Sequence, residues 1–330
     1  MPTRDGPGPD HEELLLLWSA RQTGVLDALT TTAGTVGGVA AETELDRTTA
    51  ARFVRALADY GYLRRVGGEY EPTNRALGFL ATRDVRSIGA TPRALDLLDS
   101  IAALGAGDDG VRDGAARDAG EPDEPDASDG SNASDERLRH RLGAQAARPA
   151  AEVRAGVTAA VHAAPDAERV VDVYGGAGRY AAEFARRGHE PTLVDTARVL
   201  DAVGPMLAGQ GVETIVAERA TAVPVDDADL AVLAGVVQRR SPETNRTHLR
   251  SVHDALAPGG AVVVLEPLRG RSARARRVAV ERLAVGRGDA YAAETVEGWL
   301  DEGGFVDRVT RDVPGTDQAA VVGRRERGVD

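Results

Sequence analysis

The sequence contains no cysteine and no lysine, and each absence excludes a class of chemistry. Without cysteine, neither disulfide bonds nor thiolate metal sites can form. Without lysine, all 40 basic residues are arginine. Together with the acidic balance of the chain, this composition indicates either adaptation to high salt or drift caused by GC-rich coding, and both explanations stay open.

The sequence also lacks a long apolar run near its start. The opening residues carry no basic region, and the run from Leu14 to Trp18 is too short to cross a bilayer. We therefore expect neither a signal peptide nor a membrane anchor, and a cytoplasmic location. The 330 residues leave room for two domains and a sizeable core.

Negative charge is concentrated in one segment. The net charge is −12, and nine of these twelve charges come from Asp108–Glu136. Residues 105–136 consist almost entirely of small, acidic and proline residues, so this segment cannot repay the entropy cost of becoming ordered. We predict a flexible acidic linker there and short tails at residues 1–9 and 325–330. The acidic balance also disfavours nucleic acid as a main partner.

The residues before the linker, 10–104, have the rhythm of a winged helix-turn-helix. Apolar residues at helical spacing predict one amphipathic helix over about 10–29. A short helix to about Thr43, a second helix capped by Asp46 and a hairpin turning at Gly67–Gly68 are expected to follow.

The second helix of this region is the candidate for contact with DNA. Three arginines on it are largely offset by nearby acidic residues, so its charge is too small to drive phosphate binding. The residues concerned are Arg47, Arg52 and Arg55, with Asp46 and Asp59. We therefore expect a packing or dimer-forming module rather than a DNA-binding one.

The stretch from Val170 to Asp195 predicts a strand, a glycine turn, a helix and a second strand. Gly175, Gly176 and Gly178 interrupt the sequence after an apolar strand, and Asp195 ends the second strand. A parallel βαβ unit places such a loop, the helix N-terminus and the acidic strand end around one crevice. The crevice suits a nucleotide-like ligand.

Two nucleotide-like ligands fit this pattern. Gly176, Gly178 and Ala181 satisfy the dinucleotide pattern G-x-G-x-x-G/A, and Asp195 lies at roughly the distance expected for a ribose contact. Asp172, at the end of the first strand, favours S-adenosylmethionine instead, because a carboxylate repels a pyrophosphate but tolerates a positively charged sulfonium. A nicotinamide-dependent oxidoreductase is the alternative.

The rest of the chain alternates between strand and helix patterns. We predict an α/β fold for residues 137–324, with a Rossmann-like, mostly parallel sheet and an antiparallel edge hairpin formed by Val306–Asp312 and Gln318–Val322. The N-terminal helical, winged-helix-like domain precedes it.

The order of these motifs resembles the class I S-adenosylmethionine-dependent methyltransferases. The resemblance rests on the glycine loop after an acidic first strand, the acid ending the second strand, ALAPGG before the fifth strand and EGGF before the sixth. The N-terminal half resembles the dimerisation domain of the plant-type O-methyltransferases of the caffeate and hydroxyindole kind. This resemblance implies S-adenosylmethionine as cofactor, a small-molecule methyl acceptor and a homodimer.

The resemblance also implies roles for particular residues. Gly175, Gly176 and Gly178 would border the methionine part of the cofactor, Asp195 would bind the ribose hydroxyls, and Glu218 would lie near the adenine amine. Asp172 would hold the loop amides. Tyr174 stands where the family usually has glycine, so its side chain is expected either to crowd the methionine end or to stack beside it.

A second departure concerns proton removal. The family usually has a His-Asp-Trp run after the fourth strand, and the matching residues here are Gln238, Arg239 and Arg240. Glutamine cannot act as a general base. Methyl transfer would then need an acceptor that is already ionised or nucleophilic, such as an acidic phenol, a carboxylate, an amine or a carbanion, held in line. The other possibilities are a non-catalytic cofactor sensor, a DNA-binding regulator or a dimeric scaffold. We predict no metal site.

Overall fold

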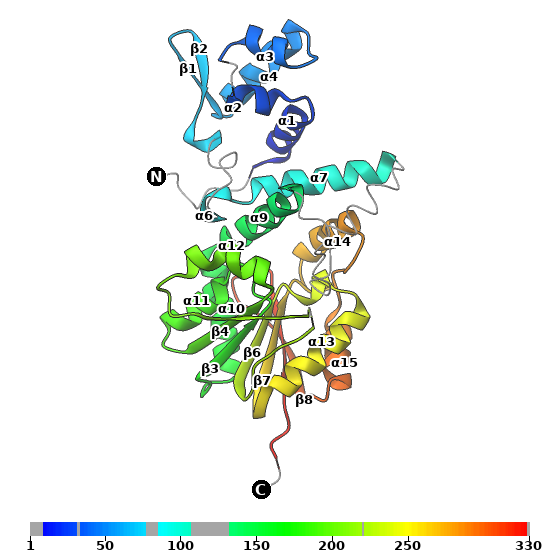
Figure 1. Cartoon of the computed structure of the whole chain (residues 1–330). Coiled ribbons are helices and arrows are strands. Elements are labelled where there is room, and N and C mark those ends of the chain that lie inside the picture. The colour runs from blue at the N-terminus through cyan, green and yellow to red at the C-terminus, as the bar shows by residue number, and fades with distance from the viewer. Residues whose placement is uncertain (1–8, 32–33, 77–84, 107–131, 220, 329–330) are drawn as a thin grey trace. The chain divides into compact units, whose positions relative to one another are not determined.

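The computed structural model describes residues 9–31, 34–76, 85–106, 132–219 and 221–328 (Figure 1). The chain divides into two compact units. One comprises the residues up to Asp99 together with Asp135–Ala147, and the other comprises Ser100–Ser134 and the residues from Arg148 onward. Most of the predicted acidic linker, residues 107–131, lies outside the described residues.

The first part of the chain forms helices and one hairpin. The elements are α1 (His11–Gln22), α2 (Val25–Thr31), α3 (Val36–Glu42), α4 (Arg47–Asp59), β1 (Leu63–Val66), β2 (Glu69–Pro72), α6 (Val85–Ile88), α7 (Thr91–Ala106) and α9 (Asn132–Ala146). The single helix predicted over 10–29 is in fact two helices. The chain breaks at Gly24, whose φ of 73° ends α1.

The helix-turn-helix and its wing follow the predicted pattern. The Asp46 side chain accepts hydrogen bonds from the N–H groups of Thr48 and Thr49, so it caps α4 as expected. Strands β1 and β2 pair antiparallel around Gly67 and Gly68, which both have positive φ. The core of this unit includes side chains that are at most 1% exposed: Leu17, Val25, Val39, Val54 and Leu57.

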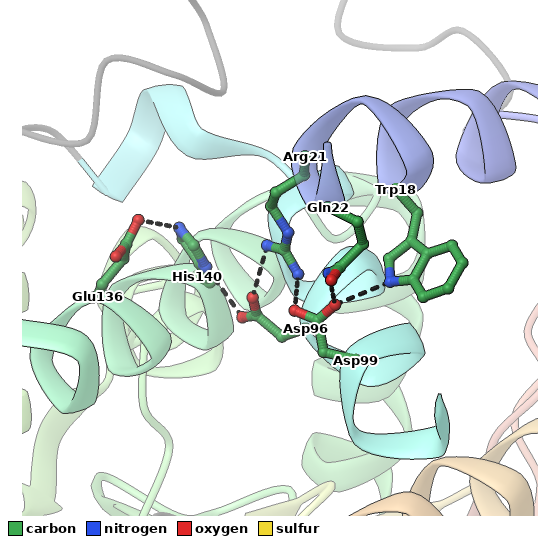
Figure 2. Close-up of polar contacts among 7 residues, drawn as sticks. All are labelled: Trp18, Arg21, Gln22, Asp96, Asp99, Glu136 and His140. Atoms are coloured by element: carbon green, nitrogen blue, oxygen red, sulfur yellow. Dashed lines mark hydrogen bonds and ion pairs between the residues drawn. The ribbon is translucent and has the colours of Figure 1, made fainter. Parts of the chain in front are cut away.

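A buried polar network joins α1 to α7 in the N-terminal unit (Figure 2). Arg21 on α1 forms ion pairs with both Asp96 and Asp99 on α7. Trp18 also donates its indole N–H to Asp99 at 2.8 Å. These contacts satisfy two carboxylates with donors from one neighbouring helix, as buried charges require.

Helix α9 adds a further contact to the same network. Nδ1 of His140 lies 2.9 Å from Oδ2 of Asp96, and both side chains are almost fully buried (Figure 2). Helix α9 begins at Asn132, five residues before the predicted start of the second domain, and from Asp135 onward it belongs to the N-terminal unit. The contact with Asp96 gives a physical reason for this difference.

The second unit is a sheet flanked by helices. Its elements are α10 (Ala150–Ala163), β3 (Arg169–Val173), α11 (Arg179–Arg186), β4 (Glu190–Asp195), α12 (Ala197–Leu207), β5 (Glu213–Val216), β6 (Ala228–Ala234), the 3₁₀ turn η1 (Val237–Arg239), α13 (Pro242–Ala255), β7 (Leu256–Glu266), α14 (Arg274–Val285), α15 (Ala293–Glu302), β8 (Val306–Asp312) and β9 (Ala319–Arg324). Among the described residues, seven strands form one sheet in the order β5-β4-β3-β6-β7-β9-β8. The first five pair in parallel, and β9 and β8 pair antiparallel, which confirms the predicted fold class.

Alternating residues along the central strands face opposite sides of this sheet. One core combines side chains from α13 and α15 with Val171, Val173, Ala231, Leu233, Val262 and Val264. The other combines side chains from α10 and α11 with Val170, Leu230, Val232, Val263 and Leu265. Figure 1 shows these helix pairs on opposite sides of the strands. Both faces of the sheet are therefore covered, as a parallel sheet requires.

The two edge strands differ from the centre. Strand β5 has only four residues. Strand β8 carries four charged residues and has an irregularity in its pairing between Val306 and Val309, where Asp307 takes a φ of 51°. Within the described part of the chain, no helix is both long and apolar enough to span a bilayer.

We expect the Asp96 network to stabilise the folded chain at neutral pH. Burial alone would raise the pKa of Asp96, but hydrogen bonds and charges from His140 and Arg21 outweigh burial and lower it below its ordinary value. Its contribution to stability is therefore present above about pH 4 and is lost as the pH falls through the folded-state pKa. The variant Asp96→Asn should lower the free energy of unfolding by about 2–3 kcal/mol at pH 7, measured by urea unfolding.

The control is Asp59→Asn, which removes an exposed carboxylate from α4. We expect this variant to unfold at the wild-type urea midpoint. We also expect the difference in free energy of unfolding between Asp96→Asn and wild type to become smaller below pH 4. Equal midpoints for the two variants at pH 7 would contradict the role given to Asp96.

Candidate functional site

The order of the strands creates a crevice at the carboxyl edge of the sheet. Strand β3 pairs with β4 on one side and with β6 on the other. The sheet therefore extends from β3 through β4 in one direction and through β6 in the opposite direction. In open α/β sheets, ligands bind at this kind of switch point. The residues that follow β3, β4, β6 and β7 therefore define the candidate site.

Asp172 and Gly175 fit against each other at the end of β3. Asp172 is fully buried, and its Oδ2 accepts a hydrogen bond from the N–H of Ala181 at 3.1 Å. A Cβ atom on Gly175 would lie 2.3 Å from the carboxyl carbon of Asp172. Gly175 is therefore required for space, because the carboxyl group occupies the volume of any side chain.

The other oxygen of Asp172, Oδ1, is buried and has no hydrogen-bond partner among the described residues. Burial raises the pKa of Asp172 to about 7, and the negative charge of Asp195 adds to this effect. A carboxyl oxygen buried without a partner is costly, so this atom is suited to a hydrogen-bond donor or a cation supplied by a ligand.

Asp195 holds the glycine loop to the end of β4. Its Oδ2 accepts the N–H of Gly176 at 2.9 Å, and its Oδ1 accepts the N–H of Thr196 at 2.8 Å. Each carboxylate oxygen can accept more than one hydrogen bond, and a carboxylate is the kind of group that accepts hydrogen bonds from ligand hydroxyl groups. The structure thus places Asp195 beside the glycine loop, as the sequence predicted.

The next two loop glycines are required for their backbone conformation. Gly176 and Gly178 have φ values of 59° and 62°, in the left-handed region that other residues rarely adopt. Gly178 is also the residue immediately before α11, and a Cβ there would lie 2.9 Å from a methyl group of Leu207. The loop sequence is therefore fixed by geometry at three glycines.

Tyr174 occupies the position where a glycine was expected, with a φ of 53°. Its side chain is only 3% exposed, and its hydroxyl donates toward the carbonyl oxygens of Arg219 at 2.7 Å and Ala222 at 3.0 Å. The guanidinium carbon of Arg240 lies 4.3 Å from the ring centroid, and the ring of His248 meets it edge-on at 5.1 Å. Tyr174 is therefore a packed wall of the crevice.

His248 on α13 is fully buried behind Tyr174. Burial lowers the pKa of this histidine well below its ordinary value, and the charges of Arg240 and Arg239 act in the same direction. Neither ring nitrogen has a hydrogen-bond partner among the described side chains and backbone groups. His248 is therefore neutral at neutral pH, and its ring packs within the core.

Gln238 and Arg239 lie in the 3₁₀ turn after β6. Nη2 of Arg239 donates to the carbonyl oxygen of Tyr174 at 3.2 Å. A Cβ on Gly288 would lie 2.2 Å from the carbonyl oxygen of Gln238 and 3.1 Å from Cα of Arg239. The main chain of this turn is therefore packed closely against the segment at Gly288.

Glu266, at the end of β7, is a site residue that sequence reasoning missed. It is 2% exposed, its Oε1 accepts the N–H of Gln238 at 3.3 Å, and its Oε2 has no hydrogen-bond partner among the described residues. The sequence signal was available, since an acid ends the apolar run of the fifth strand in VVVLEP.

Burial raises the pKa of Glu266 to about 7. Because this folded-state pKa is above the ordinary value, the contribution of Glu266 to stability is present below about pH 4 and is lost as the pH rises toward 7. Carboxyl groups whose raised pKa lowers the stability of the folded state at neutral pH are typical of functional sites.

The remaining predicted residue, Glu218, is exposed and lies two residues beyond the end of β5. The strand itself ends at Val216. Within the described residues, no group of three or more histidine, aspartate or glutamate side chains is arranged to hold a metal ion.

The close contact between Gly175 and Asp172 gives a direct test of the loop geometry. Gly175→Ala should destabilise the chain by about 1–3 kcal/mol, because the added methyl group overlaps the buried carboxyl group. Thermal and urea unfolding measure the effect. Gly204→Ala in α12 is the matched control, since no atom lies within 4 Å of the added Cβ and alanine favours the helix. An equally stable Gly175→Ala variant would refute the packing described.

Two domain families match the chain. The IclR helix-turn-helix domain matches residues 20–67, and the O-methyltransferase domain matches residues 150–305. The second match contains the glycine loop, Asp195, Gln238 and Glu266. No curated protein matches this sequence.

Solved structures resemble almost the whole chain. Human N-acetylserotonin methyltransferase in complex with S-adenosylmethionine has 18% identity and a TM-score of 0.61, over 97% of this chain and 99% of that one. A putative O-methyltransferase from Nostoc punctiforme has 20% identity and a TM-score of 0.59, over 96% of both chains. PigF with S-adenosylhomocysteine has 16% identity and a TM-score of 0.65, over 95% of this chain and 96% of that one.

At these identities the structural likeness shows the fold, and the domain match identifies the family that residues 150–305 resemble. The strand order and the glycine loop agree with both. Residues 150–305 therefore match the O-methyltransferase domain family, and the chain has the fold of the solved methyltransferases.

Proposed function

We propose that this protein transfers a methyl group from S-adenosylmethionine to a small-molecule acceptor. The observation that carries the proposal is the buried carboxyl group of Asp172, which lies against the glycine loop with one oxygen lacking a partner among the described residues. The family match and the cofactor-bound neighbours support the same conclusion.

The residues of the crevice fit this cofactor. S-adenosylmethionine carries a positive ammonium group, a positive sulfonium group and two ribose hydroxyls. Asp172 supplies a buried acceptor, Gly175 leaves the space beside it, and Asp195 places a carboxylate, the natural partner of ribose hydroxyl groups, next to the loop. A pyrophosphate would instead meet these two carboxyl groups and be repelled, which argues against a nicotinamide dinucleotide. When bound, the cofactor supplies an electrophilic methyl group.

The acceptor side of the proposal follows from Gln238. An amide cannot remove a proton, so we propose an acceptor that enters already ionised or that loses its proton readily, such as an acidic phenol or a carboxylate. We include Glu266 in the proposal as a proton acceptor, since it contacts the backbone of Gln238 and its pKa is raised to about 7. The remaining contribution of the chain is to hold the acceptor in line with the methyl group.

We also propose that the N-terminal unit forms a homodimer in the cytoplasm, as the family resemblance implies. Leu15 on α1 and Val66 on β1 are exposed at 51% and 43%, and both belong to this unit. Light scattering of the purified protein tests the oligomeric state, and a monomer at all concentrations would exclude the homodimer.

Calorimetric titration of S-adenosylmethionine tests the proposed function. We expect one site per chain, and we expect Asp195→Asn to weaken binding at least about tenfold, because the change removes a charged acceptor next to the loop. Asp201→Asn, in the exposed part of α12, is the control and should bind as wild type does. A folded wild-type protein that binds neither S-adenosylmethionine nor S-adenosylhomocysteine would exclude the proposal.

A DNA-binding regulator is the second candidate function. The match to the IclR helix-turn-helix domain favours it, and α4 exposes Arg47, Arg52 and Arg55. The nearby acids Asp46 and Asp59 are also exposed, so the helix carries little net charge. Because phosphate contacts provide most of the affinity for DNA, we rank this candidate below methyl transfer.

Fluorescence anisotropy with a labelled random DNA duplex tests this second candidate. We expect no binding in the micromolar range at about 150 mM salt. Binding that weakens with added salt and is lost in Arg52→Ala, but not in the control variant Arg250→Ala on α13, would instead assign DNA binding to α4.

A further inference from the structure

Arg239 reverses the charge that the family resemblance predicts at its position. The His-Asp-Trp run of that family has aspartate where this chain has Arg239. The guanidinium group is partly buried, and it donates to the carbonyl oxygen of Tyr174, the first residue of the glycine loop. A positive side chain therefore lies at the loop where the cofactor is proposed to bind.

Three carboxyl groups affect the pKa of this arginine through their negative charge. Burial lowers the pKa of Arg239, while the charges of Asp195, Glu266 and Asp172 oppose that effect. These acids stand at the ends of three strands, β4, β7 and β3, that meet at the crevice. The positive charge of the guanidinium group thus lies in the same field of negative charge that would favour a positively charged ligand, although Arg148 opposes it.

The main chain at Arg239 is closely packed, whereas its side chain is held less firmly. A Cβ on Gly288 would lie 3.1 Å from Cα of Arg239, which shows how closely that segment packs on the turn. In contrast, the guanidinium group makes one hydrogen bond to the described residues, with the carbonyl oxygen of Tyr174 at 3.2 Å. A ligand cation that competes for this oxygen can displace the side chain without moving the turn.

We propose that Arg239 takes the place of a positive group of the cofactor beside the glycine loop, and so sets the preference between S-adenosylmethionine and S-adenosylhomocysteine. This inference rests on the proposed function. The two ligands differ by one methyl group and the positive charge of the sulfonium, so a nearby guanidinium group disfavours the methyl donor relative to the product, which lacks that charge. Arg239 is a specificity-determining residue for the charge of the cofactor.

The test compares the affinities of the two ligands by calorimetric titration. In Arg239→Met, the ratio of the S-adenosylmethionine affinity to the S-adenosylhomocysteine affinity should rise about tenfold over wild type, because one repelling charge is removed. Arg239→Lys, which keeps the charge, should stay near the wild-type ratio. Arg250→Met removes an exposed arginine from α13 and should leave the ratio unchanged.

The outcomes separate this inference from the proposed function. An unchanged ratio in a folded Arg239→Met variant overturns the inference and leaves methyl-donor binding intact. Binding of S-adenosylmethionine by Arg239→Met, together with binding of only S-adenosylhomocysteine by wild type, supports the inference. Binding by neither protein overturns both proposals. Thermal unfolding checks the fold of each variant, and if Arg239→Met does not fold, Arg239→Gln, which keeps hydrogen-bonding capacity without charge, replaces it.

Discussion

The contact between the carboxyl group of Asp172 and the backbone of Gly175 determines the geometry of the crevice. The carboxyl group accepts the N–H of Ala181 in the first turn of α11, and it lies in the volume that a side chain at position 175 would fill. One buried acid thereby ties the end of β3 to the start of α11 and shapes the loop between them. Gly176 and Gly178 have positive φ values that other residues rarely adopt. Asp195 accepts a hydrogen bond from the N–H of Gly176 and so holds the loop in this conformation.

The crevice balances charges that are individually costly to bury. Asp172 and Glu266 both lie in the interior, and burial raises the pKa of each to about 7. Arg239 and Arg148 provide positive charge that partly offsets them. Removing water from such a cluster strengthens every interaction within it, so a small change in ligand charge has a large effect on binding. The strand order determines where the crevice lies, whereas these charged groups determine its electrostatics.

Regular patterns made most of the fold predictable. The strand over Val306–Asp312 was predicted at its observed bounds, since the glycine pair of EGGF marks its start. The break between α1 and α2 at Gly24 was harder to predict, because a single glycine inside a helical pattern is often tolerated. The environment of Tyr174 could not be predicted, since it depends on His248 and on the Arg219 carbonyl, both distant in the sequence. Glu266 was overlooked because its burial results from packing between strands.

The two ends of the sheet limit how copies of this protein can associate. Strand β5 is short, and β8 combines charged side chains with the distortion at Asp307. Neither edge presents the long, flat and apolar backbone that recruits a further strand from another molecule. The sheet is thus protected against growth by strand addition, and with it against the amyloid-like stacking that exposed β edges promote. Assembly through this seven-stranded sheet would therefore have to use side-chain surfaces rather than its edge strands.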